Sequence, residues 1–597
     1  MRRTLPLQQI TTAVLVSALL WGCASEVTRE DPGPVLPQPP AVVEEQVSLA
    51  LPPSAYRGAF NRVESALADF NWMAAANLLD AVPTPLPNAD DRAYHYYLQA
   101  RIAYLRGEQA AARALLREAT AADIAPGMLY RIRNFQHFVF SLGGEHVAAA
   151  RLAAGMLEWL PDAEITGWKQ RTWRSLQRAS AAQLEEELAS AADPQWMGWL
   201  HLAADARPDD ASLGVAITRW RSQYPNHPAD KPLPGGLDTL PESATGATRV
   251  GLILPLSGRL GPAGQAVLDG YLAAYFQART AGAVTPQLAI IDQDQHASAA
   301  AAYDAAISRG AQVIVGPLSK SAVTDLAMRP DRTVPMIALN RIDSELPPGG
   351  APVIQMSLSS EDEAITLAER AFGRGHRNAA ILTLDDDWGI QVDRALRDRW
   401  QQLGGRVVSG ATYAERDNYS SSVKDALGLL RSEERARAVR DMLATNVEFT
   451  PRRRQDLDVI FLLSRNPAQA KALKPLFAFH YAAQVPVYTL SNAYSGLPGQ
   501  ANRDLQGMHL VEIPWFLGEQ PELRVAIASG GTDSDNYARL NALGADAWLV
   551  QSQFARLRTG PQALFRGSTG LLTLDPQLHI RREATLAVFD GEGIRRN

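Results

Sequence analysis

The alternation of apolar and polar positions is clearest in residues 249–275. A run of strand length comes first, formed by Val250, Leu252, Ile253, Leu254 and Leu256. Gly261 and Gly264 keep the following loop open, and from Gln265 onward the apolar residues recur at helical spacing. This stretch predicts a strand, a glycine loop and a helix, which together open an α/β layered domain.

The same alternation continues along the chain. One set of strand-like runs lies at 251–256, 287–294, 311–318, 335–340 and 353–357, and a second at 379–386, 406–414, 458–464 and 485–491. Helical periods lie at 298–308, 319–328, 390–403, 420–430, 468–483 and 537–556. These patterns predict two parallel-sheet lobes. The tail predicts a β-hairpin with its turn at Asp575 and Pro576.

Residues 55–223 have a different pattern, in which Ala, Leu, Trp and Arg recur at helical spacing with few β-rich runs. Turn signals fall at Asn71, at Gly107 and, 37 residues later, at Gly144. Small Ala100 and Ala112 would let the two helices around Gly107 approach closely. The spacing resembles a tetratricopeptide (TPR) repeat, and a helical bundle with coincidental spacing is the alternative. We expect the tryptophans of this region to be packing residues.

Composition shifts give the domain boundaries. We predict a signal peptide at 1–22, a proline-rich tether at 23–54, a helical TPR-like domain at 55–223, a linker at 224–248 and an α/β domain at 249–597. A formal net charge of −6 gives no electrostatic argument for a nucleic-acid partner.

The single cysteine, Cys23, follows a short basic segment and an apolar segment too short to span a bilayer. Leu20, Trp21, Gly22 and Cys23 resemble a bacterial lipobox, although Trp21 is bulkier than usual. The resemblance implies a diacylglyceryl and N-acyl lipid on Cys23 and, because Ala24 follows, an outer-membrane anchor facing the periplasm. The alternative is an unmodified thiol near a cleaved signal. We expect no other cofactor.

The order of strands and helices over about 248–593 resembles the type 1 periplasmic binding protein fold. The resemblance rests on AQVIVGPLSKSAV at 311–323, DDDWG at 385–389 and GSTGLLTLD at 567–575. The predicted fold class is therefore α plus α/β, with an N-terminal TPR-like helical domain followed by a two-lobed type 1 periplasmic-binding-protein-like domain.

The combination of lipobox, helical repeats and this module resembles the LpoA family of outer-membrane lipoproteins. The local resemblance lies in LPLSGRLGPAGQAVLDGYLAAYF, IVGPLSKSAV and NVEFTPRRRQDLDVIFLL. It implies a protein without catalytic activity that reaches through peptidoglycan and stimulates a class A penicillin-binding protein, with the C-terminal domain docking. The rival interpretation is a lipid-anchored solute receptor of the branched-chain amino acid type.

Catalytic and metal motifs are weak. The order used by penicillin-recognising enzymes is approximated by three motifs: Ser421-Ser422-Val423-Lys424, Ser534-Asp535-Asn536 and Arg558-Thr559-Gly560. Only 24 residues separate Ser534 from Arg558, and they read as helix, so acyl-enzyme chemistry is disfavoured. The chain has no H-E-x-x-H sequence and no cysteine pair, and we expect no metal site.

A solute receptor of this fold would bind its ligand between the lobes, at the carboxyl ends of the strands. The candidates by position are Ser257, Ser319, Asn340, Arg341, Asp387, Trp388 and Tyr419. Pro317 has no N–H to offer in one of these loops, and Trp388 could fill the cleft. The sequence favours a closed structural cleft over a ligand pocket.

The compact basic run Arg452, Arg453 and Arg454 is the candidate docking edge for a partner, because arginine is favoured at interface anchors. The alternative is an ordinary solvated loop.

Overall fold

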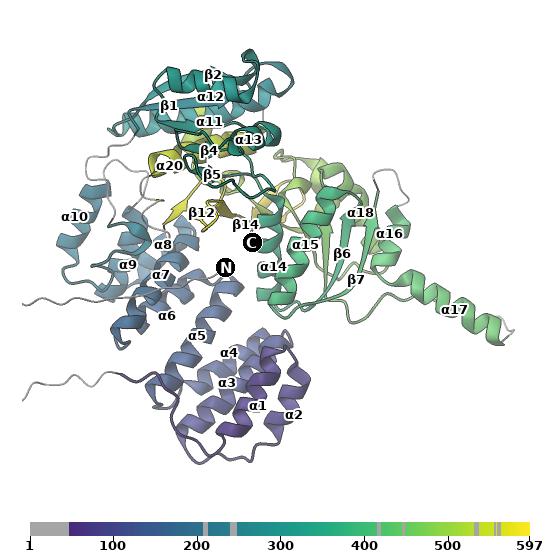
Figure 1. Ribbon diagram of the computed structural model, residues 1–597. Coiled ribbons are helices and arrows are strands. Elements are labelled where there is room, and N and C mark those ends of the chain that lie inside the picture. Colours follow the sequence, from purple (N-terminus) through teal and green to yellow (C-terminus); the bar gives the residue numbers. More distant parts are fainter. Residues whose placement is uncertain are drawn as a thin grey trace, which may run out of the picture. The chain divides into compact units, whose positions relative to one another are not determined.

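The computed structural model describes residues 47–206, 213–238, 247–414, 419–443, 448–529, 537–554, 557 and 563–597 (Figure 1). The predicted signal peptide, Cys23 and the tether up to residue 46 lie outside these residues, as does 239–246 of the predicted linker. Among the helices that the structure describes, none combines the length and apolar character that a membrane span requires.

The first part of the described chain is helical. Its helices are α1 Arg57–Ala68, α2 Trp72–Asp80, α3 Ala89–Leu105, α4 Gln109–Ala119, α5 Pro126–Gly143, α6 His146–Met156, α7 Asp162–Arg178, α8 Ala181–Ser190, α9 Pro194–Asp205 and α10 Leu213–Gln223. The described part of the predicted linker, 224–238, packs onto this region, because Leu233 and Leu237 are buried in the same core as Trp173.

The turns between successive helices lie where the sequence predicts them. Gly107 and Gly144 have φ of +86° and +83°, a left-handed conformation that glycine adopts without steric cost. At the first turn, the Asn71 side chain accepts a hydrogen bond from the N–H of Ala74 at 3.0 Å and caps α2. Ala100 and Ala112 are fully buried. The predicted turn positions and the buried alanines are therefore confirmed.

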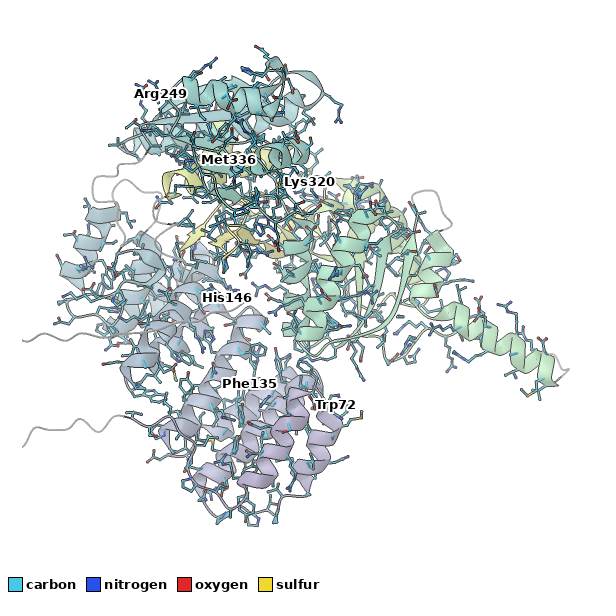
Figure 2. All side chains as sticks on the ribbon, viewed as in Figure 1. Trp72, Phe135, His146, Arg249, Lys320 and Met336 are labelled. Atoms are coloured by element: carbon cyan, nitrogen blue, oxygen red, sulfur yellow. The ribbon has the colours of Figure 1, made fainter. Side chains whose placement is uncertain are left out.

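Aromatic side chains fill the helical cores. The ring of Phe135, labelled in Figure 2, meets those of Tyr97 and Tyr104 edge-on at 5.9 and 5.6 Å between centroids. The second core contains the buried tryptophans Trp168, Trp173, Trp196, Trp199 and Trp220, with Trp159 packed against it. The predicted packing role of the tryptophans is confirmed.

The first lobe contains a parallel sheet of order β2-β1-β3-β4-β5. Its strands are β1 Arg249–Leu254, β2 Gln287–Asp292, β3 Val313–Val315, β4 Met336–Ala338 and β5 Val353–Gln355. Every residue of β3, β4 and β5 is buried, as expected where helices cover both faces of a sheet. The associated helices are α11 Gly261–Thr280, α12 Ala299–Ser308, α13 Lys320–Ala327, and from the tail α19 Pro521–Ser529 and α20 Ala538–Ser552.

The second lobe contains a seven-stranded sheet of order β15-β14-β10-β9-β8-β6-β7. The strands are β6 Asn378–Leu384, β7 Arg406–Tyr413, β8 Val459–Leu463, β9 Val487–Thr489, β10 His509–Glu512, β14 Thr585–Phe589 and β15 Ile594–Arg596. β14 and β15 are antiparallel additions to a parallel sheet. The helices are α14 Ser360–Gly373, α15 Asp387–Gln402, α16 Tyr419–Ala426, α17 Leu429–Leu443 and α18 Pro467–Phe479.

One predicted helix is wrong in its extent. The sequence predicts a single helix at 420–430, whereas α16 ends at Ala426 and α17 starts at Leu429. Gly428 between them has φ of +73°, which interrupts the right-handed helix. α17 then extends outward from the second lobe (Figure 1), and among its residues Leu429 and Ser432 are buried.

The tail forms a small third sheet of order β11-β12-β13, with bounds Leu564–Arg566, Leu571–Leu574 and Ile580–Glu583. The predicted hairpin turn is confirmed, because the N–H of Asp575 donates to the carbonyl of His579 at 2.9 Å. The 3-10 helices of the described chain are η1 Pro234–Gly236, η2 Gly258–Leu260, η3 Gln293–Gln295, η4 Ser491–Ala493, η5 Gln500–Leu505 and η6 Pro514–Leu517.

Candidate functional site

The glycine loop after β1 is tied to the neighbouring strand. The Ser257 hydroxyl donates to the Asp292 carboxylate at 2.7 Å, and the N–H of Leu256 donates to the same group at 2.9 Å. Burial raises the pKa of Asp292, but these hydrogen bonds outweigh it and hold the pKa below its ordinary value. Ser257 therefore has a structural partner within its own lobe.

The candidates after β3 and β4 also have protein partners. Ser319 caps α13 by accepting from the N–H of Ala322 at 3.4 Å, and the Asn340 amide donates to the carbonyl of Leu318 at 3.1 Å. Arg341 forms a forked ion pair with Asp362 on α14, at 3.1 and 2.7 Å. This pair joins the loop after β4 of the first lobe to the first helix of the second.

The second-lobe candidates lie at helix starts. Asp387 and Trp388 form the first turn of α15, where Asp387 is exposed. The Trp388 indole N–H donates to the Ser360 hydroxyl at 3.2 Å. Tyr419 opens α16, and its ring lies 5.6 Å from that of Tyr413. The structure thus brings Arg341 and Trp388 together at the first turn of α14, while the other candidates contact different elements.

A set of buried charges surrounds this junction between the lobes. Asp362 also pairs with Arg581 of β13 at 3.0 Å, and the adjacent Glu363 pairs with Arg582 at 2.7 Å. Farther along, Arg539 of α20 pairs with Glu512 of β10 at 2.5 Å. The sequence patterns do not predict this network, because each partner lies far away in the chain and charge alone does not identify a partner. Its hydrogen bonds hold the two lobes together through α14 and β13.

We predict that Arg341→Met lowers the free energy of unfolding by about 2 kcal/mol, because a charge-assisted pair to the buried Asp362 is lost while Arg581 remains. Urea unfolding measures the change. Lys320→Met is the matched control, since Lys320 pairs with Asp343 on the exposed surface of the same lobe and should cost less than about 1 kcal/mol. Equal effects of the two changes would contradict a stabilising role for the Arg341 pair.

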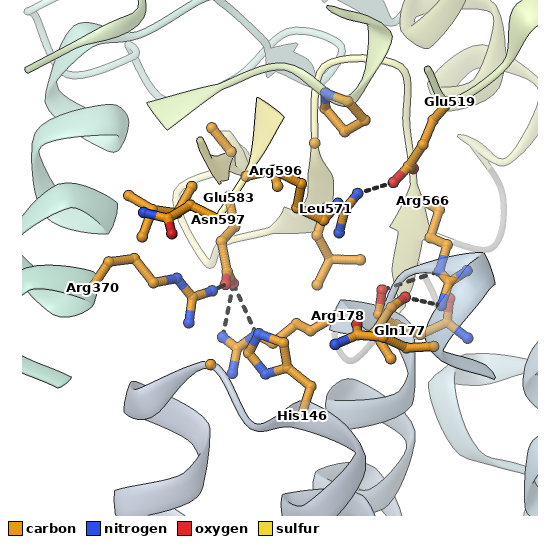
Figure 3. A pocket seen from close by; sticks show the side chains of 18 of the residues that line it. His146, Gln177, Arg178, Arg370, Glu519, Arg566, Leu571, Glu583, Arg596 and Asn597 are labelled. Atoms are coloured by element: carbon orange, nitrogen blue, oxygen red, sulfur yellow. Dashed lines mark hydrogen bonds and ion pairs between the residues drawn. The ribbon is translucent and has the colours of Figure 1, made fainter. Parts of the chain in front are cut away.

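A second group of charges lies where the helical region meets the α/β region (Figure 3). The Glu583 carboxylate contacts Arg178 of α7 at 2.7 Å and Arg370 of α14 at 2.6 Å, beside a cavity of about 160 Å³. Burial raises the pKa of Glu583, but the two guanidinium groups outweigh it and lower the pKa to about 2. His146 is buried in the same lining, and burial holds its pKa well below the ordinary value.

Backbone contacts support the same junction. A Cβ on Gly373 of α14 would lie 1.9 Å from the carbonyl oxygen of Leu142 on α5, and one on Gly107 would lie 2.3 Å from that of Gly375. Arg377 donates to the carbonyl of Tyr104 at 3.1 Å. The glycines therefore allow the two regions to pack backbone against backbone, which the sequence patterns did not indicate.

The predicted docking edge lines a pocket of about 170 Å³. Its arginines are Arg431 and Arg435 of α17 together with Arg452, Arg453 and Arg454. Arg454 pairs with Asp456 at 2.7 Å, and Arg453 donates to the carbonyl of Tyr481 at 3.0 Å. The structure thus adds two arginines of α17 to the three that the sequence singles out.

The structure describes one of the three motifs that resemble a penicillin-recognising enzyme. Ser421, Ser422 and Lys424 lie on α16, where Lys424 pairs with Glu433 at 2.9 Å. Both other motifs, 534–536 and 558–560, lie outside the described residues. The part of the chain that the structure describes contains no cluster of His, Cys, Asp and Glu suited to a metal ion.

Comparison with known proteins identifies the family. A family model described as "LppC putative lipoprotein" matches residues 62–591. The penicillin-binding protein activator LpoA of Photobacterium profundum is 27% identical over 460 residues, covering 76% of this chain and 74% of that protein. The protein of the same name from Glaesserella parasuis is 26% identical over 542 residues, covering 89% and 86%. Full-length LpoA from Haemophilus influenzae aligns structurally over 90% of this chain and 94% of that one, with 21% identity and a TM-score of 0.47. Because the family match spans most of the sequence, this chain belongs to the LppC lipoprotein family.

Proposed function

We propose that this chain is a non-catalytic lipoprotein of the outer membrane that binds and stimulates a class A penicillin-binding protein and so regulates peptidoglycan synthesis. The observation that carries the proposal is the similarity, over 76% and 89% of this chain, to proteins named penicillin-binding protein activator LpoA. In this proposal the lipid on Cys23 anchors the chain, and the described regions reach into the peptidoglycan layer.

The side chains between the lobes support a protein-binding role over solute binding. Arg341 and Trp388, the two cleft candidates that meet at α14, both have protein partners there. A solute would need to displace the ion pair between Arg341 and the buried Asp362, which is costly because Arg341 would lose its charge-assisted hydrogen bonds in a low-dielectric site. The proposed activity therefore acts through the outer surface of the α/β region, with Arg452, Arg453 and Arg454 on the docking edge.

The test combines the purified chain with a purified class A penicillin-binding protein from the same bacterium and measures glycan polymerisation and crosslinking of lipid II. We expect a stable complex and a faster rate of crosslinking. No complex and an unchanged rate would contradict the proposal.

The same preparation tests the rival functions. Leucine at saturating concentration should leave the thermal unfolding temperature unchanged, whereas a ligand that binds only the folded state would raise it. A labelled β-lactam should leave Ser421 and Ser422 unmodified. A rise in melting temperature with leucine would favour the solute receptor, and covalent labelling would favour an enzyme.

A further inference from the structure

β7 forms one edge of the seven-stranded sheet, with β6 as its neighbour in the described sheet (Figure 1). The carbonyl of Tyr413 accepts from the N–H of Asp385 on the β6 side at 2.9 Å. Backbone groups of successive residues in a strand point alternately to its two sides, so those of Gly410 and Thr412 point away from β6. Both residues are exposed. The edge therefore presents backbone donors and acceptors on which another strand can pair.

Two hollows flank this edge. A shallow groove of about 390 Å³ is lined by residues 407–412 of β7 together with Thr383, Asp393 and Arg397. The arginine-lined pocket of about 170 Å³ shares Ser409 and Gly410 with that groove. A segment lying along β7 would therefore pass directly beside the pocket.

The charge of the pocket is strongly positive within a chain of net charge −6. Five arginines line it with one acidic residue, Asp425. Arg431, Arg435 and Arg452 are exposed and have no ion-pair partner among the described residues. Guanidinium groups bind carboxylates through paired, charge-assisted hydrogen bonds. The unpartnered arginines thus select an acidic group.

Gly428 shapes this pocket as well as ending the helix before it. A Cβ at residue 428 would lie 2.9 Å from Cγ of Arg454, and the N–H of Arg454 donates to the carbonyl of Leu427 at 3.1 Å. The chain leading to β8 is thereby held against the start of α17. The arginines of two distant segments are brought together by backbone contacts and not by the charges themselves, which would repel each other.

We propose that β7 and the arginine-lined pocket form a docking site for an extended acidic segment of a partner protein. The segment adds to the sheet as a strand beside β7 and places a carboxylate among Arg431, Arg435 and Arg452. This docking site rests on the proposed function, because the partner is the penicillin-binding protein. The segment of the partner that binds here is extended and acidic. Strand addition supplies affinity through the backbone, and the arginines supply specificity for acidic side chains.

The experiment measures binding of a fluorescent peptide, as long as β7 and with threonine and glutamate alternating, to the purified full chain by anisotropy. We expect R431E/R435E/R452E to weaken binding about a hundredfold, because three favourable charge contacts become repulsive. Thr412→Pro should weaken it about tenfold, since proline removes an outward N–H without touching the β6 side. Arg437→Glu reverses one charge at an exposed residue of α17 outside the pocket lining; it is the control and should change binding less than about twofold.

Thermal unfolding of each variant checks that the fold is retained. Unchanged peptide binding in R431E/R435E/R452E would overturn the assignment of the arginine-lined pocket as the docking site. Unchanged peptide binding in Thr412→Pro would overturn the pairing of a strand with β7. Two results would assign the pocket to a phosphate ligand instead. One is binding of phosphatidylglycerol vesicles that is as strong as peptide binding and depends on the same arginines, and the other is complete displacement of the peptide by inorganic phosphate. If the unaltered chain stimulates the synthase and the triple variant does so equally, the docking site fails while the proposed function stands. If the unaltered chain gives no stimulation, the proposed function fails, and the peptide result still decides the site.

Discussion

Glu583→Gln is expected to lower the free energy of unfolding by about 3 kcal/mol. Glu583 is the counter-charge of both Arg178 and Arg370, and its carboxylate is mostly buried. Glutamine keeps the shape but leaves two guanidinium groups facing each other without a neutralising charge. Removing one member of a buried ion pair typically costs about 3 to 5 kcal/mol, because the remaining charge is uncompensated. Urea unfolding at about pH 7 measures the change.

The pH dependence of that difference is a second readout of the same contact. The pKa of Glu583 is about 2 in the folded chain and about 4.3 for an unperturbed glutamate. A depressed folded-state pKa stabilises the fold above the unfolded pKa, and that stability is lost as the pH falls toward 2. The difference in the free energy of unfolding between the unaltered chain and Glu583→Gln should therefore fall to about half of its neutral-pH value near pH 3.

Glu185→Gln is the matched control, since Glu185 is exposed on α8. Its expected effect is below about 0.5 kcal/mol at every pH. A Glu583→Gln variant as stable as this control, with no pH dependence, would show that the contact of Glu583 with Arg178 and Arg370 contributes nothing to stability.

Gly270→Ala is expected to destabilise the chain by about 3 kcal/mol, because a methyl group cannot fit between α11 and α20. A Cβ on Gly270 would lie 1.8 Å from the carbonyl oxygen of Asn541, and one on Gly544 would lie 2.0 Å from that of Val267. The obstacle on each side is backbone, so the two helices would have to separate. Such overpacking typically costs about 1 to 3 kcal/mol, and more where backbone must move.

The control for this prediction is the same substitution at another helical glycine. Gly167 of α7 is exposed, and a Cβ there would meet no atom within 4 Å. Gly167→Ala should stabilise the chain by up to about 1 kcal/mol, because alanine has the higher helix propensity. Urea unfolding followed by tryptophan fluorescence reports both variants, since Trp548 lies on α20. Effects of the same sign at the two glycines would contradict the close helix contact.

Local patterns predicted much of the fold. The strand that begins at Arg249, the turns at Gly107 and Gly144, and the hairpin at Asp575 all follow from short-range periodicity and backbone preference. The predicted start of the next helix is wrong, because α11 begins at Gly261 and not at Gln265, so that Gly261 and Gly264 lie in the helix and not in an open loop. The outward course of α17 was not predicted, because its charged residues suit a solvated helix in any direction. The break between α16 and α17 at Gly428 is explained only by the structure, in which the Arg454 side chain packs close against this glycine.

The candidate sites were less predictable because they depend on partners far away in sequence. The position of Arg341 in the chain predicts a residue of the cleft between the lobes. In the structure it forms an ion pair with Asp362, which also pairs with Arg581, more than two hundred residues later. Its position along a known fold predicted that Arg341 lies between the lobes, but it did not predict that Asp362 is its ion-pair partner. The docking role of Arg452, Arg453 and Arg454 stays a prediction, and the structure adds Arg431 and Arg435 to the same pocket.

The short strand β13 has a consequence for how the protein is made. Within four residues it supplies Arg581 to Asp362, Arg582 to Glu363 and Glu583 to Arg178 and Arg370. A ribosome releases these residues after the helices that need them, because α7 and α14 precede β13 in the chain. Folding of the junction must therefore wait until β13 has been synthesised. A chain truncated before residue 580 would remove the ion-pair partners that β13 gives to Glu363, Arg178 and Arg370, whereas Asp362 would keep Arg341. Premature termination or trimming of the C-terminus should consequently yield a substrate for proteolytic quality control.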